Sequence, residues 1–231
     1  MLEPQEHAPH GSPAARPFQL IVFDWDGTLM DSAATIVAAI QAASRDLALP
    51  VPGDQKARHI IGLGLEDALS CLFPNLDASG YADVADRYRY HYCARDHEIP
   101  LFEGIREMVS ELAEAGFLLA VATGKSRRGL NRALATTGLT PLFHATRCAD
   151  ETFSKPHPAM LLEIMDELGT DAVRTLMVGD TTHDLEMARN ARVAPVAVTY
   201  GAHPRETLRA RTPLACLDTV PALRTWFAAN V

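Results

Sequence analysis

The sequence predicts an α/β protein, in which a parallel sheet has helices on both sides and an all-helical domain is inserted after its first strand. Short apolar runs of strand length alternate with segments whose apolar residues recur every three or four positions. One stretch, 33–100, has the helical pattern and no strand-like run. Alternating strands and helices favour a parallel sheet, because each crossover helix packs back onto the sheet.

The first strand is predicted at Leu20–Phe23, an apolar run that ends at Asp24. Similar runs predict three further strands, at 117–122, 175–178 and 196–198. Segments with helical spacing lie between them, at 105–115 and 158–168. Gly116 and Gly169 follow these segments as stop signals. Residues 18–32 and 101–231 are therefore assigned to the core domain.

The inserted domain is assigned to residues 33–100. Its helical patterns lie at 33–47, 65–73 and 81–95. The first carries one apolar stripe, formed by Ile36, Val37, Ile40, Ala43 and Leu47. Residues 1–17 are rich in Pro, His, Gly, Ser and Ala, and we expect a disordered tail there.

Composition excludes two classes of protein. The chain has 21 Lys and Arg against 29 Asp and Glu, a net charge of -8, so we expect no nucleic-acid partner. No apolar run reaches the roughly 18 residues of a membrane span, and the first 17 residues do not resemble a signal peptide. Four scattered cysteines without a CxxC pair favour a reducing compartment, so the protein is expected to be cytoplasmic. Monomer and homodimer remain open.

Polar residues follow the predicted strands where ligands of open α/β sheets bind, beyond the carboxyl ends of the strands. The segments are Asp24–Thr28, Thr123–Ser126 and Gly179–Asp184, together with Lys155 at the start of a helix. Each segment alone is common in turns and helix caps. Their occurrence together, in order, predicts one site at this edge of the sheet.

The residue types at this edge suit phosphoryl transfer. A carboxylate can attack phosphorus as a covalent nucleophile. Asp24, Asp180 and Asp184 would repel one another unless a hard cation lies among them, and Mg²⁺ prefers oxygen ligands. Lys155 and Thr123 would then contact the phosphoryl oxygens.

Together these segments resemble the four motifs of the haloacid dehalogenase-like hydrolase superfamily. DWDGT is similar to the first motif, Thr123 to the second, Lys155 in KPHP to the third, and Gly179-Asp180 with Asp184 to the fourth. The resemblance implies a Rossmann-like core with a helical cap domain. FDWDGTLMDS, ATGKS, FSKPHP and VTYGAHP are most similar to segments of phosphoglycolate phosphatases and their relatives.

The resemblance also implies catalytic roles. Asp24 would be the nucleophile that forms an aspartyl-phosphate, and Asp26 would protonate the leaving group and then activate water. Thr123, Gly124 and Lys155 would bind the phosphoryl group. The implied substrate is a small phosphate ester such as phosphoglycolate.

The implied cofactor is Mg²⁺. Its ligands would be the side chains of Asp24 and Asp180 and the backbone carbonyl of Asp26, with Asp184 as a further ligand or as an anchor for one.

Several related activities remain open at this point. Dehalogenases of the superfamily have Tyr at the position of Asp26, so this chain is more similar to the phosphatases. Phosphosugar mutases often have Val at the position of Thr28. The alternatives are a phosphosugar mutase or another branch, and a non-catalytic module that binds or regulates.

The cap would determine substrate specificity through the segment Arg58–Gly64, whose glycines permit a tight turn toward the core. Arg58 or His59 would pair with a small carboxylate such as that of phosphoglycolate. A plain turn between two helices explains the same segment equally well.

One position departs from the family pattern. Relatives have an Ala-Gly pair at the end of the helix after the fourth motif, and this chain has Ala191-Arg192. Gly adopts a left-handed conformation there, which would cost Arg on the order of 1 kcal/mol. Either Arg192 accepts this strain or the loop takes another path.

Overall fold

The computed structural model describes residues 17–231, so the predicted tail lies outside the described residues except for Pro17. The described strands form one sheet in the order β3-β2-β1-β4-β5-β6, and every pair is parallel. The strands are β1 (Leu20–Phe23), β2 (Leu118–Thr123), β3 (Ala145–Cys148), β4 (Thr175–Gly179), β5 (Ala194–Val198) and β6 (Ala215–Leu217). The predicted parallel α/β core is confirmed.

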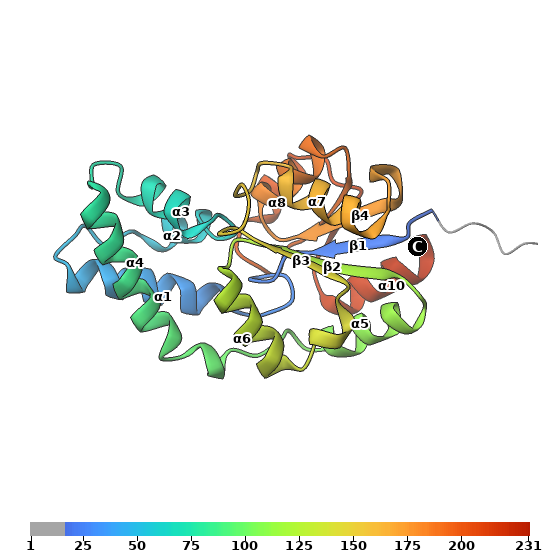
Figure 1. Ribbon diagram of the computed structural model, residues 1–231, viewed down its shortest axis with the longest axis horizontal. Coiled ribbons are helices and arrows are strands. Elements are labelled where there is room, and N and C mark those ends of the chain that lie inside the picture. The colour runs from blue at the N-terminus through green and yellow to red at the C-terminus, as the bar shows by residue number, and fades with distance from the viewer. Residues whose placement is uncertain (1–16) are drawn as a thin grey trace, which may run out of the picture.

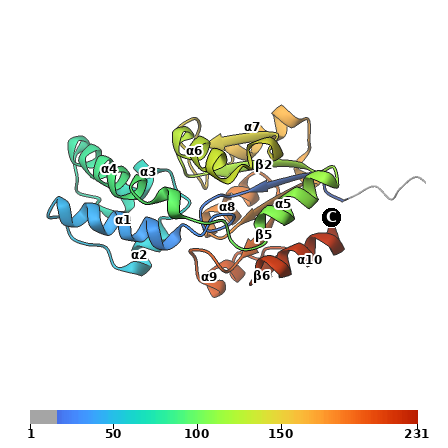
Figure 2. The same cartoon turned by 90° about the horizontal axis from the view of Figure 1, so that it is seen from below.

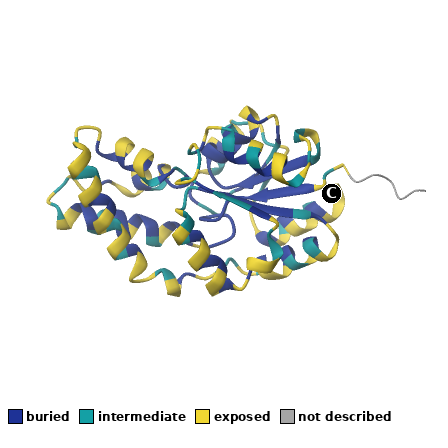
Figure 3. Cartoon of the chain, viewed as in Figure 1, coloured by how far each residue is buried: buried dark blue, intermediate teal, exposed yellow. Residues whose placement is uncertain are grey.

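Helices cover both faces of the sheet (Figure 1). One face packs against α5 (Ile105–Glu114), α6 (Arg127–Thr137) and α10 (Val220–Asn230), and the other against α7 (Ala159–Leu168) and α8 (Thr182–Asn190), with α9 (Arg205–Arg209) beside α8. In β1, Ile21 and Phe23 face the first group, and Leu20 and Val22 face the second. Burial on both sides explains why the sequence of β1 is continuously apolar (Figure 3).

The inserted domain is all-helical among the described residues, as predicted. Its helices are α1 (Ala33–Asp46), α2 (Asp54–His59), α3 (Leu65–Leu72) and α4 (Ala78–Cys93), followed by a short 3₁₀ turn at Asp96–Glu98. Helix α1 packs along α4, and the domain extends from the carboxyl edge of the sheet (Figure 2). The exact limits of 33 and 100 stay a prediction.

Some elements differ from the sequence-based expectation. Helix α4 begins at Ala78 and not at Tyr81, because the side chain of Asp77 caps it by accepting a hydrogen bond from Gly80 N at 2.8 Å. Strands β3 and β6 were not predicted from the sequence; they are the two edge strands of the sheet and carry fewer buried residues. No helix in residues 17–231 has both the length and the apolar character needed to span a membrane.

Arg192 adopts the left-handed conformation, with φ 60°. Helix α8 ends in a Schellman motif, because Val193 N donates to Ala188 O at 2.8 Å and Arg192 N donates to Arg189 O at 3.0 Å. This closure requires a left-handed residue at position 192. The loop therefore follows the usual path of a glycine-ended helix, and Arg192 bears the strain.

Arg192→Gly is expected to raise the free energy of unfolding by about 1 kcal/mol, because glycine adopts φ 60° without a Cβ clash. For a chain of this size the melting temperature would rise by about 2–4 °C, measured by calorimetry. The control is Ala191→Gly, where φ is -86° and the same change should lower the melting temperature. An unchanged or lower value for Arg192→Gly would contradict the strain.

Candidate active site

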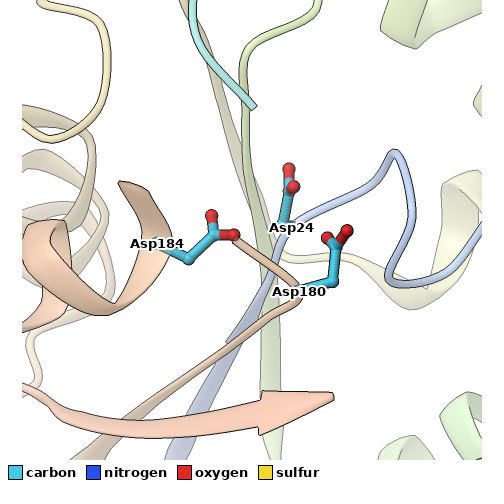
Figure 4. Close-up of side chains that lie close together, drawn as sticks. All are labelled: Asp24, Asp180 and Asp184. Carbon is cyan, nitrogen blue, oxygen red and sulfur yellow. The ribbon is translucent and has the colours of Figure 1, made fainter. Parts of the chain in front are cut away.

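Three buried carboxylates meet at the carboxyl edge of the sheet. Asp24 follows β1, Asp180 follows β4, and Asp184 lies in the first turn of α8. One carboxylate oxygen from each lies within 4.8 Å of the others, and the side chains point toward a common space (Figure 4). Strands β1 and β4 are adjacent and in register, with Asp24 N donating to Val178 O at 2.9 Å. Strand pairing thus brings distant parts of the chain to one point.

A capping box orients Asp184. Its Oδ2 accepts hydrogen bonds from Thr181 N at 3.0 Å and from Thr181 Oγ1 at 2.7 Å, and Thr181 Oγ1 accepts from Asp184 N. These bonds fix Oδ2 against the start of α8. The remaining oxygen, Oδ1, faces Lys155.

Lys155 bridges two of the acids. Its Nζ lies 2.7 Å from Asp24 Oδ1 and 2.7 Å from Asp184 Oδ1, and its side chain is fully buried. Burial alone would lower the pKa of Lys155, but the two carboxylates outweigh it and raise this pKa above its ordinary value. Lys155 is therefore an ammonium ion inside the protein.

The carboxylate of Asp180 accepts two hydrogen bonds and packs closely against two glycines. Thr28 Oγ1 donates to Asp180 Oδ1 at 2.8 Å, and Ala202 N donates to Asp180 Oδ2 at 2.7 Å. A Cβ atom at Gly27 or at Gly201 would lie 2.2 Å from Asp180 Oδ2. Both positions therefore require glycine, and Gly27 also has φ 80°.

When fully ionised, the acidic cluster carries more negative charge than Lys155 can balance. Burial raises the pKa of Asp24 well above its ordinary value, and Asp184 and Asp180 raise it further although Lys155 opposes them. Burial and Asp184 raise the pKa of Asp180 to about 7. Lys155 supplies one positive charge to three carboxylates.

The cluster fits a divalent cation. Both carboxylate oxygens of Asp24 are buried: Oδ1 contacts the ammonium of Lys155 at 2.7 Å, and Oδ2 has no polar partner among the described residues. A cation would coordinate these oxygens and balance the excess charge. The donor set contains only oxygen, which suits a hard metal ion.

Asp26 lies apart from the acidic cluster. Its Oδ1 accepts hydrogen bonds from Ser32 Oγ at 2.7 Å and from Lys125 Nζ at 2.9 Å. Its side chain is therefore not a member of the group of three carboxylates. The role of the Asp26 backbone carbonyl as a metal ligand stays a prediction.

Thr123 and Gly124 lie at the end of β2, the strand that pairs with β1 on the side away from β4. Thr123 is buried at the end of β2, next to β1, and its Oγ1 accepts a hydrogen bond from Lys125 N at 3.2 Å. A Cβ atom on Gly124 would lie 2.4 Å from Leu63 O and 2.6 Å from Gly62 O. The inserted domain therefore rests directly on the backbone of Gly124.

The segment Arg58–Gly64 lies against the core elements that carry the acids. The carbonyl of His59 contacts the imidazole Nε2 atoms of His183 at 2.8 Å and His203 at 3.1 Å. Gly64 N donates to Ser154 Oγ at 2.8 Å. The predicted packing of this turn against the core is thus observed.

The two cap residues singled out from the sequence have different surroundings. The ring of His59 stacks on His203, with 5.1 Å between centroids. The guanidinium of half-buried Arg58 makes no hydrogen bond or ion pair with residues 17–231.

Four residues that hold the site were not singled out from the sequence: Thr28, Ser32, Thr181 and Ala202. Three of them lie inside or beside segments quoted for the resemblance, and Thr181 follows the motif aspartate. Their position next to the motifs was a usable signal. Tyr92 of α4, which contacts Lys125, had no such signal.

The fold is a Rossmann-like core with an inserted helical domain, and its site presents a cluster of carboxylate oxygens. The sequence pattern of the haloacid dehalogenase-like hydrolase family matches residues 21–198. This chain belongs to that family.

Similar proteins and a solved structure support this family assignment. The chain is 38% identical over 206 residues to the "Probable phosphatase IndB" of Dickeya dadantii, covering 87% of this chain and 89% of the relative. It is 35% identical over 190 residues to a phosphoglycolate phosphatase of Agrobacterium fabrum, covering 79% and 81%. A hydrolase from Pseudomonas syringae has the same fold, with a TM-score of 0.85, 21% identity, and coverage of 92% and 99%. The chain is a phosphoric monoester hydrolase.

In metal-free buffer the protein is expected to lose stability as the pH rises from about 4 to about 7. The folded pKa of Asp180, about 7, exceeds its ordinary value of 3.8, so the folded state holds a proton that the unfolded chain has released. The stability is present at low pH and is lost as the pH passes the folded value.

Thermal unfolding in EDTA at several pH values measures this slope. Asp180→Asn should make the slope shallower, and Asp166→Asn, at an exposed position on α7, should leave it unchanged. An equal slope in Asp180→Asn would contradict the assignment.

Proposed function

We propose that this protein is a Mg²⁺-dependent phosphatase that hydrolyses a small phosphomonoester through an aspartyl-phosphate intermediate. The observation that carries the proposal is the state of Asp24, a buried carboxylate with one oxygen paired to Lys155 and the other without a polar partner among the described residues. It lies beside a buried ammonium and two further carboxylates. Such a group is available both to a cation and to a phosphorus atom.

The proposed reaction has two halves. In the first, an oxygen of Asp24 bonds to phosphorus while the bond from phosphorus to the ester oxygen breaks, and Asp26 gives that oxygen a proton. In the second, Asp26 removes a proton from water, and the water oxygen displaces Asp24 from phosphorus. Lys155, Thr123 and Gly124 would hold the phosphoryl oxygens, and the ammonium of Lys155 would match their charge.

Mg²⁺ would be held by Asp24 and Asp180, by the backbone carbonyl of Asp26, and by Asp184 directly or through the bonds that orient it. When bound, the ion supplies positive charge to the phosphate oxygens and so stabilises the charge that develops on them. The two donors to Asp180, Thr28 and Ala202, support this role because they fix the direction of its carboxylate.

We assign residues 33–100 as a cap that encloses the leaving group, and we place a substrate carboxylate at Arg58. The guanidinium of Arg58 has no partner among the described residues, and its segment lies against the site. Phosphoglycolate carries such a carboxylate next to its phosphate. The relative from Agrobacterium fabrum has the same named substrate. We place the enzyme in the cytoplasm, since its four cysteines are all unpaired.

The wild-type protein is expected to release phosphate from p-nitrophenyl phosphate in the presence of Mg²⁺ and to lose activity in EDTA. Asp24→Asn should reduce kcat by at least about 10³-fold, because the amide cannot act as the nucleophile. Asp166→Asn, on the exposed side of α7, should retain full activity.

If the wild type and Asp24→Asn are equally inert on a broad panel of phosphate esters that includes phosphoglycolate, the protein is instead a binding or regulatory module. Conversion of one sugar phosphate into its isomer without release of phosphate would identify a mutase.

Arg58→Ala is expected to raise KM for phosphoglycolate about 10-fold to 100-fold, the loss for one charged hydrogen bond. The same variant should keep its KM for p-nitrophenyl phosphate, which has no carboxylate. Arg45→Ala, at an exposed arginine of α1, is the matched control. Equal effects of Arg58→Ala on both substrates would exclude a carboxylate contact.

A further inference from the structure

We propose that Lys125 and Tyr92 are positioning residues that hold the carboxylate of Asp26 in its working orientation while the helical domain rests on the core. The inference rests on the proposed function, because it concerns the proton donor of that reaction. Neither residue is assigned a contact with substrate.

The ammonium of Lys125 joins three parts of the chain. Lys125 lies two residues after Thr123, in the loop that follows β2. Its Nζ lies 2.9 Å from Asp26 Oδ1, in the loop that follows β1, and 2.8 Å from Tyr92 Oη, in the last turn of α4. The side chains of Lys125 and Asp26 are each only 10% exposed. The helical domain therefore reaches the proposed acid through one intervening side chain.

The contacts to Asp26 leave one of its oxygens available. Ser32 Oγ and Lys125 Nζ both bind Oδ1, at 2.7 Å and 2.9 Å. Oδ2 accepts no hydrogen bond within residues 17–231, and it is not fully enclosed. Two donors on one oxygen restrict the rotation of the carboxylate and leave the other oxygen without a donor. Oδ2 is therefore the atom that would exchange the proton.

Tyr92 is itself firmly held. Its side chain is buried, and its ring stacks on Tyr88 with 5.7 Å between centroids. The Lys125 ammonium also lies 4.7 Å from the centroid of the Tyr92 ring. Burial raises the pKa of Tyr92 far above its ordinary value, so its hydroxyl stays neutral and accepts a hydrogen bond from Lys125.

This arrangement couples the acid to the helical domain. Lysine has a long, flexible side chain, and Tyr92 provides one of the two hydrogen bonds that fix its end. Movement of α4 away from the core would remove that bond and free Lys125 to leave Asp26. Efficient proton transfer from Asp26 would therefore require α4 to rest on the core, the arrangement in which the leaving group is enclosed and bulk water is excluded.

The test compares two substrates of nearly equal size whose leaving groups differ. Phenolate needs a proton in the transition state much more than p-nitrophenolate does. Phenyl phosphate and p-nitrophenyl phosphate therefore report how well the acid is placed, and kcat/KM reports the half-reaction in which the leaving group departs. The variant Asp26→Asn removes the proton donor, so its kcat/KM on the two substrates shows the largest difference to be expected.

Tyr92→Phe and Lys125→Met are expected to lower kcat/KM for phenyl phosphate about 10-fold more than for p-nitrophenyl phosphate, a smaller form of the Asp26→Asn pattern. Lys125→Arg should restore part of the loss, because it keeps a donor to Asp26. Tyr88→Phe is the matched control, since Tyr88 stacks on Tyr92 and makes no hydrogen bond to Lys125, and it should behave as wild type.

An equal loss on both substrates, or no loss, in Tyr92→Phe and Lys125→Met would overturn the inference, because these residues would then only join the two domains. That result leaves the proposed function intact if the wild type is active and Asp26→Asn discriminates between the substrates. An inert wild type would overturn both proposals.

Discussion

The central constraint on this structure is that three carboxylates and one ammonium must be held together in the protein interior, which costs free energy. Nothing local to Asp24 would bring Asp180 within reach, and only the parallel pairing of β1 with β4 does so. Each acid is then fixed by a different device. Asp184 is fixed by the cap of α8, Asp180 by Thr28 and a backbone amide, and Asp24 by the ion pair with Lys155. Burial and mutual repulsion disfavour the charged form of the cluster, so the cluster lowers the stability of the folded protein. A bound cation would stabilise it.

Close approach of backbone to backbone joins the helical domain to this site. The carbonyl groups of Gly62 and Leu63 lie where a side chain at Gly124 would have to be. Gly124 of the second motif and Gly62 of the cap turn therefore contact each other through their backbones. The site consequently depends on both domains, although all three carboxylates of the cluster belong to the core.

Much of this arrangement could be predicted from the sequence, for identifiable reasons. Strands covered on both faces are apolar throughout, so β1 and β4 were recognisable, and the aspartates that follow them had to meet. The edge strand β3 contains Thr and Arg and gave no such signal. The partner of Asp26 could not be predicted either, because the bridge from Lys125 to Tyr92 depends on how α4 packs. For Arg192 the sequence identified an unusual residue at the end of the helix but left open whether the loop or the residue adapts, and the left-handed φ of 60° shows that the residue does.

The contact of His59 has a consequence for how such enzymes diversify. The atom that faces His183 and His203 is the main-chain oxygen of His59, which every amino acid possesses. This main-chain contact between the domains therefore does not depend on the side chain at position 59, although the imidazole of His59 adds a stacking contact with His203. A substitution at position 58 or 59 leaves this main-chain contact in place. Under the proposed role of Arg58, the preference for a leaving group can therefore change during evolution while this contact between the domains is kept.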